Sequence, residues 1–63
     1  MLHYEIQFIN TYGHIIYSVF VDCKTDKQAI AKAKREKKTT GIIYPDTAWI
    51  EILCFETKKR IYA

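Results

Sequence analysis

The stretch AWIEILCF, residues 48–55, limits the folds open to this chain, because it is apolar on both faces of a strand. Alternate side chains of a strand point to opposite faces of its sheet. One face would carry Ala48, Ile50, Ile52 and Cys54, and the other would carry Trp49, Glu51, Leu53 and Phe55. The sequence predicts a strand over residues 47–56, and a short chain has few elements with which to cover both of its faces.

Two further strands precede this stretch. Residues 2–9 alternate cleanly between apolar and mixed positions, which is the pattern of a strand with one buried face. The segment NTYG, residues 10–13, is a turn, because Asn and Gly tolerate the positive φ that hairpin loops need. Residues 14–23 form the second strand, which is rich in β-branched and aromatic residues. Its inward residues would be Ile15, Tyr17, Val19, Val21 and Cys23, and its outward residues His14, Ile16, Ser18, Phe20 and Asp22.

The segment TDKQAIAKAKREKK, residues 25–38, is rich in helix-forming residues. Thr25 caps its start, and Gln28, three residues later, completes a capping box. We expect the helix to end at the following TTG, where Gly41 is available for a left-handed exit. Charged residues at its ends suit the helix dipole, namely Asp26 in the first turn and Lys37 and Lys38 in the last. Its apolar stripe is narrow and consists of Ala29, Ile30 and Ala33, so the helix covers one face of a sheet only.

The order of elements is β-β-α-β, with Arg60–Tyr62 as a candidate for a short fourth strand. The helix crosses back after the hairpin, so the third strand pairs beside the first. The sequence therefore predicts a single α+β domain over residues 1–63, with an antiparallel sheet in the order 2-1-3 and one helix on one face. We expect Ile42, Ile43 and Tyr44 to close one end of the core. The predicted core is Leu2, Tyr4, Ile6, Phe8, Ile15, Tyr17, Val19, Val21, Ile30, Ala33, Ile50 and Ile52.

This strand order also predicts the state of the two cysteines. Cys23 and Cys54 would both point inward, from strands that flank the first strand. Two strands separated by a third lie about 9–10 Å apart, twice the strand spacing. A disulfide needs Cα atoms within about 7 Å. We therefore expect two buried free thiols.

Composition places the chain among small folded proteins. Its 63 residues are 49% hydrophobic, which is too high for a disordered chain, and their net charge is +3. A mildly basic chain favours nucleic acid or an acidic protein surface as its partner. No run of 18 apolar residues is present, and no basic segment with a following apolar stretch begins the sequence. We expect a cytoplasmic protein that does not enter a membrane.

The outward face of the sheet carries the most unusual side chains. If the helix covers only the inward face, a large apolar patch meets water, which monomers rarely tolerate without a binding role. The patch consists of Ile9, Ile16, Phe20, Trp49, Leu53 and Phe55. It suits a homodimer interface, a surface for another protein, or an aromatic platform for single-stranded nucleic acid. Because Glu5, Asp22 and Glu51 share this face and repel phosphate, we predict a protein interface, through which the chain dimerises or docks on a larger protein.

A basic helix supports an alternative function. Its cations are Lys27, Lys32, Lys34, Arg35, Lys37 and Lys38, and the later turn adds Lys58, Lys59 and Arg60. Such residues can contact phosphates, and each contact makes binding more sensitive to salt. The simpler interpretation is the solvated side of an amphipathic helix, where lysine stems cover apolar neighbours. A small nucleic-acid-binding protein is therefore the alternative to a protein-binding module.

No pattern in the sequence indicates catalysis, a metal or a cofactor. The residues with ligand chemistry lack the spacing of metal motifs, and they are His3, His14, Cys23 and Cys54. The chain has no paired carboxylate motif, glycine-rich phosphate loop or nucleophile elbow. One helix on a small sheet also leaves little room for a substrate pocket. We expect a non-enzymatic protein without a metal or cofactor.

The run VDCKTDKQAIAKAKRE, residues 21–36, resembles a common joint in which a strand ends in an acid and a capped Ala/Ile/Lys helix follows. It is similar to the ββα units of very short proteins that phages and mobile elements encode. Some of those proteins act as anti-CRISPR or other anti-defence inhibitors. The resemblance covers about a quarter of the chain and implies no particular active residue. It implies a small accessory protein that docks on a larger protein or nucleoprotein machine and blocks it.

Overall fold

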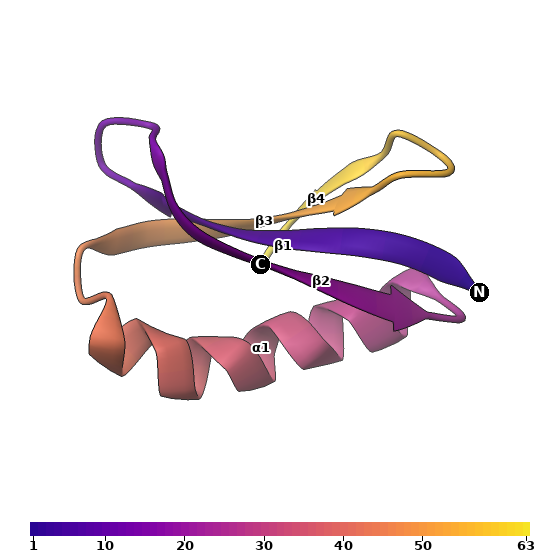
Figure 1. Ribbon diagram of the computed structural model, residues 1–63, viewed down its shortest axis with the longest axis horizontal. Coiled ribbons are helices and arrows are strands. Elements are labelled where there is room, and N and C mark those ends of the chain that lie inside the picture. Colours follow the sequence, from indigo (N-terminus) through magenta and orange to yellow (C-terminus); the bar gives the residue numbers. More distant parts are fainter.

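The computed structural model describes all 63 residues and contains four strands and one helix. The strands are β1 (Leu2–Asn10), β2 (Ile15–Cys23), β3 (Thr47–Cys54) and β4 (Arg60–Tyr62), and the helix is α1 (Asp26–Ile43). Neighbouring strands pair antiparallel in the order β2-β1-β3-β4, which confirms the predicted α+β class and the 2-1-3 order. Figure 1 shows α1 on one side of the sheet, whereas the β1–β2 and β3–β4 turns rise on the other side.

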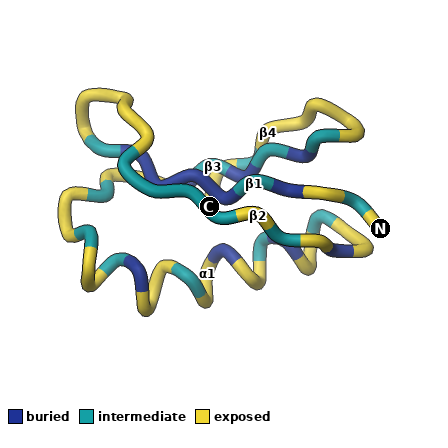
Figure 2. The backbone as a smooth tube through the Cα atoms, viewed as in Figure 1, coloured by how far each residue is buried: buried dark blue, intermediate teal, exposed yellow.

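The core lies between α1 and the sheet face that α1 covers, and its buried positions follow β1, β3 and one side of the helix (Figure 2). The predicted core residues that are fully buried are Tyr4, Ile6, Phe8, Ala33, Ile50 and Ile52. Those that are half-buried and pack against them are Leu2, Tyr17, Val19, Val21 and Ile30. Cys23 and Cys54 are buried and unpaired, which confirms two free thiols.

The start of α1 forms as the sequence predicts. The Thr25 hydroxyl accepts a hydrogen bond from the Gln28 amide at 3.3 Å, and the Gln28 side chain accepts one from the Lys24 amide at 3.0 Å. The first bond satisfies an amide of the first helical turn, whereas the second reaches the residue before the cap and not the Thr25 amide that a capping box uses. The Tyr4 hydroxyl donates to the Asp26 carboxylate at 2.6 Å, which fixes the first turn of α1 to the sheet. Burial and this carboxylate raise the pKa of Tyr4, and the Tyr4 hydrogen bond lowers the pKa of Asp26.

The end of α1 differs from the prediction, because the helix continues through Gly41 to Ile43. Gly41 has no positive φ, and Lys37 and Lys38 therefore lie more than one turn before the end. Helical φ and ψ are disfavoured for a residue that precedes proline, so Pro45 excludes Tyr44 from the helix. Tyr44 adopts φ −118° and ψ 73°, and its amide donates to the Thr40 carbonyl at 2.8 Å.

The longer helix also changes where Ile42, Ile43 and Tyr44 lie. Ile42 and Ile43 project from the last turn and are 81% and 71% exposed, so the prediction that they close the core is wrong for both. Tyr44 alone returns toward the sheet, where its ring stacks on Tyr17 with centroids 5.2 Å apart. The chain therefore leaves two large aliphatic side chains in solvent at the C-terminal end of α1.

A β-bulge near the β1–β2 turn makes two side chains point to the opposite face from the one predicted. Phe8 pairs with Tyr17 and Ile9 with Ile15, so Ile16 is one residue in excess on β2. An extra residue shifts the two-residue alternation of a strand. Ile15, predicted in the core, is 53% exposed and lies opposite Ile9, whereas Ile16, predicted to face outward, packs against the core.

Candidate functional site

The side of the sheet opposite α1, called the outer face below, is not covered by any helix (Figure 1). Its side chains alternate with the core residues along each strand, and the register aligns them in rows across the sheet. One row runs from Phe20 through Glu5 and Leu53 to Arg60. The outer face is therefore built from all four strands.

Aromatic side chains dominate the exposed part of the outer face. Phe20 and Tyr62 are 69% and 70% exposed, and Trp49 is 37% exposed. Phe20 from β2 stacks on Phe55, which follows β3, with ring centroids 6.1 Å apart and planes at 23°. Because β1 lies between β2 and β3, this pair bridges the central strand on the outer side. Four aromatic residues from three strands and one turn thus share a surface without a cover.

A polar network holds the middle of the outer face. The Arg60 guanidinium lies 3.1 Å from the Glu51 carboxylate and donates to the Gln7 side-chain oxygen at 3.3 Å. The Trp49 indole N–H donates to the other Glu51 oxygen at 2.8 Å. Gln7 is 5% exposed although it lies on this face. The network fixes the Trp49 ring and neutralises the arginine that lies on the outer face.

The structure places the six predicted interface residues in different environments. Phe20 and Trp49 are exposed on the outer face, and Leu53 and Phe55 are half-buried there. Ile9 is only 4% exposed, because Trp49 and Ile15 flank it on the neighbouring strands. Together with the reversed Ile16, it does not belong to the accessible patch.

Two accessible outer-face residues were missing from the prediction, namely Ile15 and Tyr62. The bulge turns Ile15 outward, and no local signal in β2 marks that bulge. Tyr62 reaches the face because it pairs with Glu51 on β3. The sequence suggested a strand over Arg60–Tyr62 but did not indicate its register.

A small charged cluster lies at one end of the outer face. The His3 imidazole contacts the Glu56 carboxylate at 2.5 Å and lies 3.8 Å from Asp22, and the His3 amide donates to Glu56 at 2.8 Å. The hydrogen bond with Glu56 and the nearby carboxylates raise the pKa of His3 above 6.5. The bonds from the backbone and side chain of His3 lower the pKa of Glu56 to about 2. The cluster joins β1, β2 and the β3–β4 turn.

The basic side chains of α1 are exposed and point in several directions. Lys27, Lys34 and Lys38 are separated by seven and four residues, so they align on the side away from the sheet. Lys32 instead donates to the Asp22 carbonyl at 3.2 Å, and Lys37 lies toward the β3 side. A short stripe of three lysines, extended by the adjacent Arg35, thus faces solvent.

The three basic residues near the C-terminus do not form one patch. Lys58 occupies a turn position with φ 61°. Lys59 turns toward the helix side and lies 3.4 Å from Asp26. Arg60 points to the outer face, where Glu51 pairs with it. The structure therefore separates residues that are consecutive in the sequence.

Charge is distributed unequally over the molecule. Residues 24–38 contain seven cations and two carboxylates, which gives +5, and the rest of the chain contains three cations and five carboxylates, which gives −2. Most of the helix charge is on the far side of the sheet from the aromatic residues of the outer face. The molecule thus has a basic side and a weakly acidic, aromatic side.

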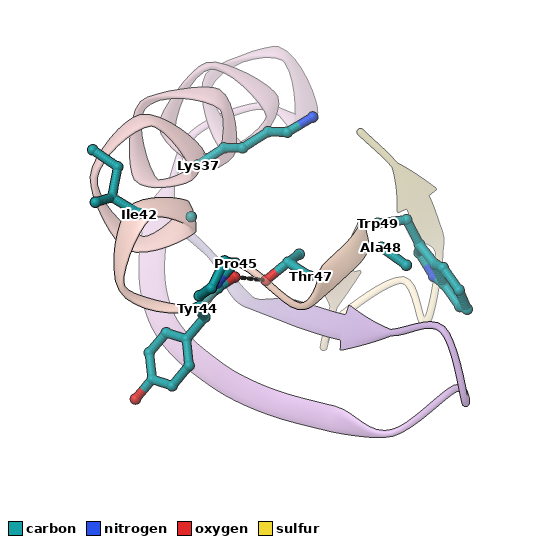
Figure 3. Close-up of a pocket in the computed structure, with 8 residues that line it drawn as sticks. Lys37, Ile42, Tyr44, Pro45, Thr47, Ala48 and Trp49 are labelled. Carbon is teal, nitrogen blue, oxygen red and sulfur yellow. Dashed lines mark hydrogen bonds between the residues drawn. The ribbon is translucent and has the colours of Figure 1, made fainter.

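A hollow of about 290 Å³ lies where the end of α1 meets the start of β3 (Figure 3). Lys37, Ile42, Tyr44, Pro45 and Trp49 are among its lining residues. The lining contains no carboxylate, imidazole or thiol. No group of three or more His, Cys, Asp or Glu side chains is placed to hold a metal ion.

No family model matches this chain, and no curated protein or solved structure shows significant similarity to it. The helix is not apolar enough over its length to cross a membrane. The surfaces described above are therefore the basis for a functional proposal.

Proposed function

We propose that this chain is a non-enzymatic binding module that docks on another protein through the outer face. The observation that carries the proposal is the group of four aromatic side chains, Phe20, Trp49, Phe55 and Tyr62, on a sheet face that no element of the chain covers. Exposed aromatic residues in one patch are enriched where proteins bind proteins. The resemblance of residues 21–36 to the ββα units of short phage proteins, some of which are inhibitors, suggests that the partner is a larger machine, which the docked module blocks.

The charges around these aromatic residues favour a protein over a nucleic acid. A platform that stacks bases needs free cations beside its rings to follow the phosphates. On the outer face the one arginine, Arg60, is paired with Glu51, and the remaining charged groups include the carboxylates of Glu5 and Asp22. These groups suit the polar rim of a protein interface.

The same charges favour a different protein over a second copy in face-to-face contact. A two-fold interface must be complementary to itself. Glu5 has no ion-pair partner within the chain, and the one arginine on the outer face of a second copy, Arg60, is already paired with Glu51. A partner with a free cation opposite Glu5 is therefore a better match for this face.

Site-specific photo-crosslinking tests whether the outer face contacts another protein. Benzoylphenylalanine replaces Tyr62 on the outer face or, as a control, the also highly exposed Ile42 at the end of α1. In cells that express the chain, we expect a discrete adduct from position 62 and none from position 42. Adding Trp49→Glu or Phe20→Glu should remove the adduct while circular dichroism shows an unchanged fold. An adduct that survives both changes, or that also forms at position 42, contradicts the proposal.

The basic side of α1 supports a second candidate function, the binding of nucleic acid. The supporting observation is the solvent-facing stripe of Lys27, Lys34, Arg35 and Lys38, for which no ion pair exists within the chain. Four phosphate contacts predict roughly a hundredfold loss of affinity between 50 and 200 mM salt. Fluorescence anisotropy with duplex and single-stranded DNA measures this, and the Lys34→Glu/Lys38→Glu double change should abolish binding. Salt-independent binding, or none, removes this candidate.

A further inference from the structure

The sheet has one long free edge, which is β2. The opposite edge is β4, which has only three residues, whereas β2 has nine and contains neither proline nor lysine. Proteins commonly protect edge strands with such residues or keep them short, because an open edge can pair with another chain. The only charged residue of β2, Asp22, lies next to its last position. The β2 edge is therefore open along most of its length.

The backbone groups that face this edge can be identified from the bonds of β1. The His3 carbonyl accepts from the Phe55 amide at 2.9 Å, and the His3 amide donates to Glu56, so both groups of His3 point toward β3. His3 and its β2 partner Asp22 are thus not bonded to each other, and antiparallel strands alternate bonded and non-bonded pairs. Asp22, Phe20 and Ser18 therefore direct their amides and carbonyls to the free edge.

One of these edge groups is already satisfied within the chain. Lys32 from α1 donates to the Asp22 carbonyl at 3.2 Å. This bond agrees with a carbonyl that points away from β1, as derived above for Asp22. Ser18 and Phe20 have no such partner, and their four backbone groups meet solvent. Beside them, Tyr17, Val19 and Val21 are only half-buried on the side that faces α1. The open edge thus combines unpaired backbone groups with an incompletely covered apolar row.

We propose that a second copy of this chain pairs with this edge, β2 against β2 and antiparallel, about a two-fold axis at Val19. The two four-stranded sheets then form one continuous sheet of eight strands. Ser18 and Phe20 of each copy bond with Phe20 and Ser18 of the other, which gives about four backbone hydrogen bonds. This inference does not depend on the proposed docking function, because it uses the edge of the sheet and not its outer face.

The register follows from the side chains of β2. Centred on Val19, the pairing uses all nine residues, sets Tyr17 opposite Val21 of the second copy, and lets Val19 meet itself. Asp22 then lies opposite Ile16 at each end, where the bulge already interrupts regular pairing, so its bond from Lys32 is retained. A two-fold axis at Phe20 would shorten the pairing. It would also place Ser18 opposite Asp22, whose carbonyl already accepts a bond from Lys32. The Val19 register therefore has no like charges in opposition and displaces no existing bond.

The pairing also fixes how the two sheets face. The joined sheet keeps one arrangement of faces, because a two-fold axis at Val19 leaves Val19 of both copies on the side that faces α1. The outer faces of the two copies therefore lie side by side.

Electrostatic repulsion between the two copies opposes this pairing, and it makes the association depend on salt in a way that can be measured. Each copy carries a net charge of +3, so two copies repel each other as they approach. Added salt screens this repulsion. Association through β2 should therefore strengthen as salt rises from 50 to 300 mM, whereas binding of nucleic acid should weaken over the same range.

A cysteine on the two-fold axis tests the register directly. In a non-bonded antiparallel pair the two Cα atoms lie about 4.5 Å apart, which is within the range of a disulfide. We expect Val19→Cys to form a covalent dimer under mild oxidation. Val21→Cys, which would face Tyr17 of the second copy, is the matched control and should not crosslink. Cys23 and Cys54 are buried in both variants and give both the same background.

Two further variants test the pairing at β2. Ser18→Pro removes an edge amide that has no partner in the monomer, so light scattering should show at least a tenfold weaker dimer with an unchanged circular dichroism spectrum. Trp49→Glu should leave the Val19→Cys crosslink intact, which separates this inference from docking at the outer face. A strictly monomeric protein at millimolar concentration, or equal crosslinking at positions 19 and 21, overturns the inference.

Discussion

Replacing Gly41 with alanine tests whether α1 continues through this residue. Glycine in a helix is less favourable than alanine because it loses more backbone freedom on folding. A Cβ atom added at Gly41 meets no heavy atom within 4 Å, so no clash offsets the gain. Gly41→Ala should therefore stabilise the protein, whereas a left-handed helix end at this position would make the same change destabilising.

The expected gain is the difference in helix propensity, about 0.5–1 kcal/mol. For a domain of this size, 1 kcal/mol shifts the melting temperature by roughly 4–8 °C, so we expect an increase of about 2–8 °C. Urea denaturation followed by circular dichroism measures the free energy of unfolding, and a thermal melt measures the temperature shift. The two measurements should agree in sign.

The other glycine of the chain is the matched control. A Cβ at Gly13 also meets nothing within 4 Å, so the two positions differ mainly in backbone conformation. Gly13 has φ +81°, in a turn where the Asn10 side chain accepts from the amides of Tyr12 and His14. An alanine there should cost about 1–2 kcal/mol. If Gly41→Ala destabilises the protein as Gly13→Ala does, the helix ends before Ile43 and the reasoning fails.

Two other predictions concern the charged cluster and the core. Because the pKa of His3 is raised and that of Glu56 is lowered to about 2, their pair should stabilise the fold most between pH 4.5 and 6.5. Stability should decline as pH rises through the folded pKa of His3 or falls toward 2, and Glu56→Gln should flatten this profile in urea titrations. Ile52→Val should cost about 0.5–1.5 kcal/mol because Ile52 is fully buried. The same change at the exposed Ile42 should stay within about 0.5 kcal/mol, and equal costs at the two positions would place Ile42 in the core.

Features that depend on neighbours in the sequence were predictable. The start of α1 is decided by Thr25 and Gln28, whose hydrogen bonds span three or four residues. The order of the strands followed from one hairpin and one crossover, and it correctly kept Cys23 and Cys54 apart. The end of α1 was placed too early because Gly41 permits an exit from the helix without requiring one, whereas Pro45 enforces the exit only at Tyr44.

By itself, the sequence determined which residues can share a strand face, where the helix begins, and that one sheet face would remain without a helix. The tertiary structure decided what that face contains. It buried Ile9 beneath its neighbours, turned Ile15 outward, and brought Arg60 to Gln7, 53 positions away along the chain. The physical reason is register: a strand that shifts by one residue presents its other face, and only pairing between distant strands fixes that shift.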